Sequence, residues 1–273
     1  MKSFEPKIAI VIVLIIGLLQ FSACSSSGVS ESQSSSTKGP PVQSDETENL
    51  SIPEETPEVD IDILPELEPV LPVTLTDAVG NTVTITSVER IIPLDGSVAE
   101  VVFALNLGAN VVATDRSATW PPEASELPQI GYQRSLLAEP IAGFTPTVLI
   151  GTEIAGPEKT LDDLRRLGYP VVIVPSEATM QGPAEKIRAV AEALGVPNRG
   201  EELVTQMEKT IVSNTQVFEE DMRPVVAALY IRGTGTQLVL GRNSATHWLI
   251  NAAGGKNVAD ILDIDQYKTI TAE

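Results

Sequence analysis

The stretch TVLIGTEIAGPEKTLDDLRRLGYPVVIVP, residues 147–175, carries the pattern that decides the fold. It begins with the apolar run TVLIGT (147–152) and ends with PVVIVP (170–175), and the helical pattern EKTLDDLRRLG (158–168) lies between them. Short apolar strands that alternate with amphipathic helices are typical of parallel βαβ units, in which helices cover both faces of the sheet. The sequence therefore predicts an α/β fold.

The same alternation continues on both sides of this stretch. Upstream, β-branched runs on either side of Gly80-Asn81 predict a hairpin, and Ser97 is suited to cap a helix that runs to Leu107. The further strands that we expect lie at 90–94, 110–115, 225–231 and 238–241, and the further helices at 183–194, from Gly200 to about Asp221, and at 245–255. This pattern indicates one α/β lobe, a long helical connection and a second α/β lobe.

The bulk properties exclude several classes of protein. The chain has 273 residues, with 18 basic and 37 acidic residues and a formal charge of −19. This length is sufficient for one or two domains with a substantial core. Binding to nucleic acid needs clustered Lys and Arg, and no basic patch is visible, so we expect no nucleic-acid partner. A single cysteine excludes an internal disulfide.

The N-terminus has the pattern of a bacterial lipoprotein signal. Lys2 and Lys7 precede an apolar run of 12 residues at 8–19, which is short for a membrane span. Phe21-Ser22-Ala23-Cys24 then resembles a lipobox, with Phe21 where Leu is usual. We predict that residues 1–24 are a signal peptide with a lipobox and that Cys24 becomes the lipidated N-terminus on the extracytoplasmic face of the cell membrane. The alternatives are an ordinary signal peptide and an uncleaved anchor.

Residues 25–72 have the composition of a disordered tether. They contain ten Ser, seven Pro and eleven acidic residues against the single base Lys38, a net charge of −10. Such a segment buries too little apolar surface to offset its ordering entropy. The remaining predicted domains are an N-terminal α/β lobe at 73–183, a helical connector at 184–222, and a C-terminal α/β lobe at 223–273 that we expect to be incomplete.

The order of these segments resembles a known family. The segments are IIPLDGSVAEVVFALNLGANVVATD (91–115), WPPEASELPQIGYQRSLLAE (120–139), the stretch at 147–175 and GRNSATHWLINAAGGKN (241–257). Their order and spacing over residues 73–273 resemble the substrate-binding lipoproteins of ABC importers for vitamin B12, siderophores and haem, in which two rigid lobes are joined by a backbone helix. GYQRSLLAE is most similar to the hemin-binding branch. The resemblance implies a protein, not an enzyme, that captures haem in an inter-lobe cleft and delivers it to a permease dimer.

In that branch, the resemblance implies that Tyr132 and Tyr230 are axial ligands of the haem iron. Phenolate is an established ligand of haem iron, and because free tyrosine has a pKa near 10, the iron and a nearby cation must help it to ionise. Arg134 and Arg232 follow the two tyrosines at a spacing of two, and on a strand this spacing places both side chains on one face. Each arginine either supports the phenolate, pairs with a haem propionate, or is a solvated surface charge. Trp120 is expected to line the cleft, or else to anchor its loop.

GYQRSLLAE has a weaker copy, QYKTITAE (266–273), at the end of the chain. In the family, a glutamate on each lobe docks on one of the two permease subunits, so the resemblance implies this role for Glu139 and Glu273. Exposed carboxylates that meet arginines give orientation and on-rate more than affinity. The alternative is that each glutamate simply favours the dipole at the start of a helix.

Other functions and cargoes have weaker support. The chain has no nucleophile elbow and no glycine-rich phosphate loop, and His247, its one histidine, cannot build a zinc site alone. We expect His247 to have a capping or rim role. A ferric siderophore would favour several arginines without an iron ligand, and cobalamin would favour tryptophans, so a tyrosine on each lobe favours haem. An adhesion or receptor module with the same fold is a third possibility.

Overall fold

The computed structural model describes residues 68–215, 217–233 and 235–270. The predicted signal with Cys24, most of the predicted tether and Glu273 lie outside the described residues. No helix in the described ranges is long and apolar enough to cross a membrane.

The N-terminal part is built on a parallel sheet. Its three strands are β3 (Ile91–Pro93), β4 (Val148–Thr152) and β5 (Val171–Val174), in the order β3-β4-β5. The predicted hairpin is formed by β1 (Val73–Thr76) and β2 (Thr82–Ile85), which pair antiparallel. The apolar runs of the opening stretch are thus the two parallel neighbours β4 and β5, as predicted.

Helices cover both faces of this sheet, which confirms the α/β prediction. Along β4, Val148 and Ile150 belong to one apolar core, and Leu149 belongs to another on the opposite face. The helices of this part are α1 (Gly96–Ala104), the 3₁₀ turn η1 (Gly108–Asn110), α2 (Pro122–Glu126), α3 (Ala138–Gly143), α4 (Glu158–Arg166), α5 (Gly182–Ala193) and α6 (Pro197–Asn214). Residues of α1, α5 and α6 lie in the first core, and residues of α3 and α4 lie in the second.

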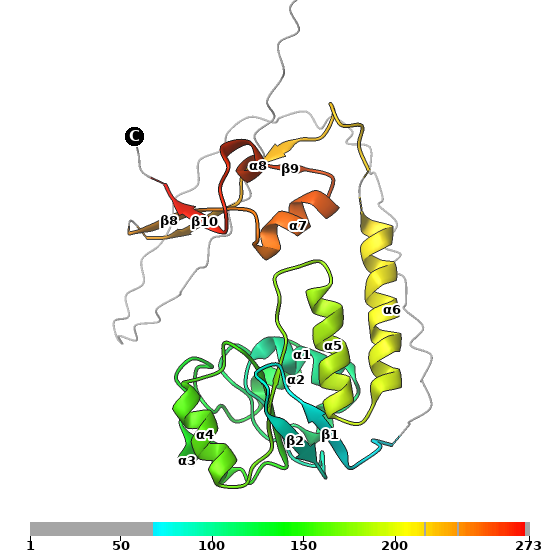
Figure 1. Cartoon of the computed structure of the whole chain (residues 1–273), viewed down its shortest axis with the longest axis vertical. Helices are drawn as coiled ribbons and strands as arrows, with labels where there is room; N and C mark the ends of the chain where they lie inside the picture. The colour runs from blue at the N-terminus through cyan, green and yellow to red at the C-terminus, as the bar shows by residue number, and fades with distance from the viewer. Residues whose placement is uncertain (1–67, 216, 234, 271–273) are drawn as a thin grey trace, which may run out of the picture. The chain divides into compact units, whose positions relative to one another are not determined.

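Helices α5 and α6 lie side by side (Figure 1). Their close approach depends on Gly200, because a Cβ atom there would lie 2.5 Å from the Cβ of Ala191. Ile187 of α5 packs in the same core as strand residues such as Val172. The predicted connector of residues 184–222 therefore begins with a helix that shares the core of the N-terminal part, and its second helix ends at Asn214.

The C-terminal part contains antiparallel as well as parallel pairs. Its elements are β6 (Val225–Val226), β7 (Leu229–Arg232), β8 (Thr236–Leu240), α7 (Ala245–Ala252), β9 (Lys256–Asn257), α8 (Val258–Leu262) and β10 (Tyr267–Thr269). One sheet has the antiparallel order β10-β8-β7, and β6 pairs parallel with β9. The strand predicted at 225–231 is therefore divided into two strands that enter different sheets. The connection from β7 to β8 is too short for a parallel crossover, so these strands form a hairpin.

Two local predictions in the N-terminal part were wrong. Asp95, and not Ser97, caps α1, because its carboxylate accepts a hydrogen bond from the backbone N–H of Val98 at 3.1 Å. The segment 110–115 makes isolated bridges instead of a continuous strand, since Val111 pairs with Ile91 while Thr114 turns to pair with Gln129. The segment thereby leaves the sheet and joins the loop that leads to Tyr132.

Candidate functional site

The loop that contains Tyr132 lies at the carboxyl ends of β3 and β4, the edge at which open parallel α/β sheets bind ligands. Its backbone is anchored on two sides. The N–H of Arg116 donates to the carbonyl of Gly131 at 2.8 Å, and the N–H of Gly156, in the loop after β4, donates to the carbonyl of Gln133 at 2.8 Å. Both neighbours of Tyr132 are therefore fixed to loops from other parts of the sequence.

The side chain of Tyr132 is presented to solvent from this fixed backbone. Tyr132 is 44% exposed, and its carbonyl accepts a hydrogen bond from the N–H of Ser135, which closes a turn. Gly131 has a φ of +105°, a conformation that other residues adopt only with strain. Arg134 is exposed in the same turn. The geometry offers a phenol oxygen and a guanidinium to a bound molecule.

Two buried aspartates support these loops. The carboxylate of Asp115 accepts hydrogen bonds from the backbone N–H of Ser117 at 3.0 Å and from its Oγ at 2.9 Å. The Ser117 Oγ in turn accepts from the N–H of Gly96 at 2.9 Å, and Asp95 accepts from the N–H and Oγ1 of Thr152 at 2.9 and 3.0 Å. Burial raises the pKa of the Asp115 carboxyl, the Ser117 hydrogen bonds lower it, and the charge of Asp95 raises it further.

The loop after Asp115 carries further groups at this edge. Trp120 is 63% exposed, so it is not a buried anchor of its loop. Arg116 is also exposed, and it was not among the residues predicted from the sequence. Its one signal was its place directly after a predicted strand, in the run ATDR. Within the described residues, neither Arg116 nor Arg134 forms an ion pair.

Tyr230 and Arg232 lie on β7 in the C-terminal part. Tyr230 pairs with Leu238 and Arg232 pairs with Thr236 in a regular antiparallel ladder, so the two side chains project from the same face. Both residues are exposed, Tyr230 by 46%. The structure therefore gives this Tyr-x-Arg pair the common strand face that the sequence predicted.

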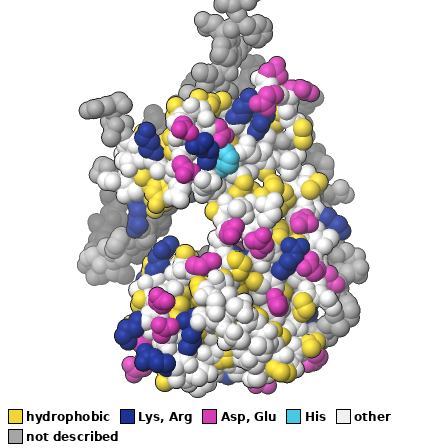
Figure 2. All heavy atoms as spheres, viewed as in Figure 1, with side chains coloured by type: hydrophobic (Ala, Val, Ile, Leu, Met, Phe, Trp, Pro, Cys, Tyr) yellow, Lys and Arg dark blue, Asp and Glu magenta, His cyan; other side chains and the backbone are white. Residues whose placement is uncertain are grey.

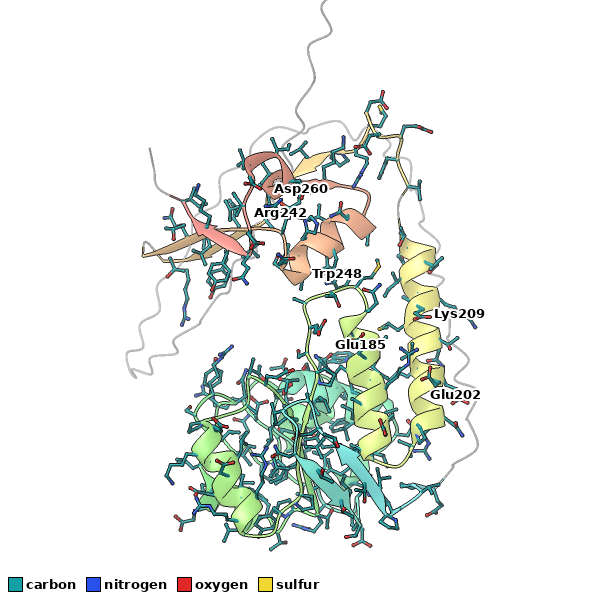
Figure 3. All side chains as sticks on the ribbon, viewed as in Figure 1. Glu185, Glu202, Lys209, Arg242, Trp248 and Asp260 are labelled. Atoms are coloured by element: carbon teal, nitrogen blue, oxygen red, sulfur yellow. The ribbon has the colours of Figure 1, made fainter. Side chains whose placement is uncertain are left out.

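Both ring nitrogens of His247 lie near polar side chains of the C-terminal part. Its Nε2 lies 3.3 Å from Nδ2 of Asn251, and its Nδ1 lies 3.4 Å from Nδ2 of Asn257 and 3.9 Å from a carboxylate oxygen of Asp260. Figure 2 shows the histidine at the surface beside acidic and basic side chains, and Figure 3 labels Asp260. No group of three or more metal-binding side chains occurs among the described residues. Both ring nitrogens therefore face polar side chains of the C-terminal part, and the rim role of His247 stays a prediction.

The two predicted docking segments differ in backbone conformation. Glu139 is exposed in the first turn of α3. Tyr267, the counterpart of Tyr132 in the second copy, lies in strand β10 and pairs with Leu240, whereas Tyr132 lies in a turn. The likeness of the two sequences is thus not a likeness of local structure, and Glu273 lies outside the described residues.

Solved structures similar to this chain include several haem-binding proteins. The periplasmic heme-binding protein RhuT from Roseiflexus sp. RS-1 is 44% identical, with a TM-score of 0.62 over 67% of this chain and 70% of that protein. The heme-binding protein HmuT is 29% identical, with a TM-score of 0.63 over 77% of this chain and 70% of that protein. The heme-binding protein HutB of Vibrio cholerae is 28% identical, with a TM-score of 0.60 over 68% of this chain and 71% of that protein.

Curated relatives belong to the same class. The vitamin B12-binding protein of Vibrio parahaemolyticus is 24% identical over 63% of this chain. The ABC transporter substrate-binding lipoprotein YvrC of Bacillus subtilis is 24% identical over 70% of this chain. The chain spans about 61% and 62% of the lengths of these two relatives. The family described as "Periplasmic binding protein" matches residues 91–273, more than half of the chain, and the protein therefore belongs to that family.

Proposed function

We propose that this protein is an extracytoplasmic binding protein that captures haem and delivers it to the permease of an ABC importer. The observation that carries the proposal is Tyr132, a half-exposed phenol on an anchored turn at the carboxyl ends of the strands. The likeness to solved haem-binding proteins, 44% identical in one case, supports haem as the cargo. Transport, rather than catalysis, is the activity that family membership favours.

Each side chain of the site has a proposed role. Tyr132 and Tyr230 donate phenolate oxygens to ferric iron, which these hard anionic donors suit. Arg134 and Arg232 lie at a spacing of two from these tyrosines and stabilise the phenolates or pair with the propionates of the haem. Trp120 lines the ligand with an aromatic face. Haem is a transported cargo in this scheme and not a resident cofactor.

The proposal is tested by titrating the purified protein with hemin. We expect a red-shifted Soret band and a charge-transfer band typical of high-spin ferric haem with a tyrosinate ligand. Replacing both Tyr132 and Tyr230 with Phe should abolish this spectrum. Tyr169→Phe is the matched control, because Tyr169 packs beside the second core and its hydroxyl donates to the carbonyl of Ala142 at 3.3 Å. A full spectrum in the double variant would refute the ligand assignment.

Cobalamin is the second candidate cargo, because several curated relatives are vitamin B12-binding proteins. A competition experiment separates the two cargoes. If haem is the cargo, excess cyanocobalamin leaves the tyrosinate spectrum unchanged and binds weakly in a separate titration. Tight binding of cobalamin together with no hemin spectrum would establish the alternative, and a ferric siderophore is tested in the same way.

We also propose that the protein is attached to the membrane through a lipid on Cys24. The lipoprotein relative from Bacillus subtilis supports this proposal. In cells grown with labelled fatty acid, the wild-type protein should carry the label, and replacing Cys24 with Ala should abolish it without a change in the hemin spectrum. Absence of label from the wild-type protein would favour an ordinary signal peptide or an uncleaved anchor instead.

A further inference from the structure

A ring of hydrogen bonds joins the loops at the carboxyl ends of β3 and β4. Asp95 accepts from the N–H and Oγ1 of Thr152, and the carbonyl of Thr152 accepts from the N–H of Ala155 at 2.9 Å. The next residue, Gly156, donates to the carbonyl of Gln133. The ring thus runs from the start of α1 through the loop after β4 to the residue that follows Tyr132.

Asp115 closes the ring on its other side. Its carboxylate binds Ser117, whose Oγ accepts from the N–H of Gly96, next to Asp95. The backbone N–H of the next residue, Arg116, donates to the carbonyl of Gly131 at 2.8 Å, in the loop of Tyr132. Asp115 has no exposed surface, so water does not replace these donors. The carboxylate therefore links the loop of Tyr132 to the start of α1.

The residues around Asp115 strengthen this link. The N–H of Thr114 donates to the carbonyl of Pro128 at 2.9 Å, and the N–H of Ile130 donates to the carbonyl of Thr114 at 2.9 Å. The N–H of Arg116 binds Gly131. Residues 114–116 thus run beside residues 128–131 and hold them through backbone bonds, up to the residue before Tyr132.

We propose that Asp115 is a positioning residue for Tyr132: it fixes the turn at 131–135 so that the phenol is held ready for the ligand. Groups that are fixed before binding lose less conformational entropy when the ligand arrives. Asp115 itself is buried and acts through its hydrogen bonds with Ser117 and through the backbone bonds of its neighbours Thr114 and Arg116. The inference rests on the proposed function, because it requires Tyr132 to be an iron ligand.

The test compares Asp115→Asn with Asp77→Asn in the full chain. Asp77 is a matched control: its side chain is also buried, and it accepts hydrogen bonds from the N–H groups of Val79, Asn81 and Ile173 at 3.1, 2.7 and 3.3 Å. These partners lie in the hairpin turn and in β5, and none belongs to the Tyr132 loop. Both substitutions keep the shape of the side chain and lower the stability of the same part of the protein.

The readouts are the tyrosinate charge-transfer band and the rate at which hemin passes to apomyoglobin. Loss of a group that orients a metal ligand typically costs about 10- to 100-fold in metal affinity, so we expect Asp115→Asn to weaken the band and to raise the transfer rate about tenfold or more. Asp77→Asn should lower the melting temperature and leave the band and the rate unchanged. Equal band and rate in the two variants would overturn the positioning role.

Ser117→Ala keeps the test decisive if Asp115→Asn does not fold. Ser117 is exposed, and its loss removes the Oγ bonds to Asp115 and Gly96 while the carboxylate remains. We expect a smaller rise in the transfer rate than for Asp115→Asn, and an unchanged rate would contradict the role of the ring. Failure of the wild-type protein to show a tyrosinate band would instead refute the proposed function itself.

Discussion

At the scale of single residues, Asp115 also predicts how stability depends on pH. Burial raises the pKa of this carboxyl above its ordinary value of 3.8, so the folded protein binds the proton more tightly than the unfolded chain does. The contribution of Asp115 to stability is therefore fully present below that ordinary value and decreases as the pH rises through the folded pKa. The stability that Asp115→Asn costs should thus be largest at low pH and should shrink as the pH rises. Urea unfolding of the wild-type protein and of Asp115→Asn, from below pH 3.8 upward, measures this difference in the free energy of unfolding. A difference that grows with pH would contradict the raised pKa.

Gly131 gives a second prediction at the residue scale. Its φ is +105° and a Cβ there would meet no atom within 4 Å, so Gly131→Ala introduces backbone strain without a steric clash. We expect a loss of stability of about 1 kcal/mol, together with a weaker tyrosinate band. Gly80→Ala is the control, since Gly80 has a φ of +90° and open space in the hairpin turn. If both variants lose the same stability and keep the same band, the turn at Tyr132 does not tune the ligand.

The sequence identified some of these residues and not others, for a physical reason. Tyr132 stands out because it follows a glycine in a loop with an arginine two residues later. Asp115 is not conspicuous, because its importance comes from hydrogen bonds with Ser117 and from the backbone bond of its neighbour Arg116 to Gly131, which lies on a different loop. Such contacts depend on the tertiary fold and leave no local pattern.

At the scale of elements, the pairing of α5 and α6 predicts which contacts hold the helices together. The guanidinium of Arg188 binds Glu201 at 2.8 and 3.1 Å, and this hydrogen bond lowers the pKa of the Glu201 carboxyl. Both side chains are largely exposed, and exposed ion pairs contribute little to stability. The close approach at Gly200 is more restrictive, because an added Cβ would overlap with Ala191.

We therefore expect Gly200→Val to lower the free energy of unfolding by about 1–3 kcal/mol, a typical cost of overpacking. Arg188→Ala should have a clearly smaller effect, and high salt should reduce that effect further. Urea unfolding at low and high salt measures both. A larger loss in Arg188→Ala than in Gly200→Val would show that the ion pair, and not the packing, holds α6 against α5.

Some strands were predictable from the sequence and others were not. The parallel strands β4 and β5 were predictable, because they are buried on both faces and read as continuous apolar runs. The segment 110–115 has a similar composition but is not a continuous strand, because Thr114 satisfies its backbone groups with Pro128 and Ile130. The run at 225–231 divides into β6 and β7, which enter different sheets. Apolar composition indicates burial, but it does not determine which partner a strand chooses.

At the scale of the whole molecule, the order of the elements was the most informative feature of the sequence. It predicted the α/β class and the family, and the match to residues 91–273 confirms the family. It did not predict the antiparallel sheet β10-β8-β7, because the alternation of strands and helices that signals parallel pairing is interrupted between β7 and β8. The domain boundaries and the residues of the haem site remain predictions.

The proposed delivery of a cargo to a permease involves the whole molecule. A substitution of Glu139 tests it. Glu139 is exposed in the first turn of α3, on the helix that follows the Tyr132 turn. A carboxylate there is available to a basic partner and is not needed for the contacts that anchor the turn, which are made by backbone groups. Charge reversal should therefore separate docking from binding.

We expect Glu139→Arg to bind hemin with an unchanged spectrum and to lose uptake through the cognate permease in a cell that depends on hemin as its iron source. Glu185→Arg is the control, because Glu185 is also an exposed acid in the first turn of a helix, α5, as Figure 3 shows. Both changes remove the same favourable interaction with a helix N-terminus. If uptake falls only with Glu139→Arg, the loss reflects the partner and not the helix. Normal uptake by Glu139→Arg, or an equal loss in both variants, would remove the docking role and leave Glu139 with a purely local contribution to α3.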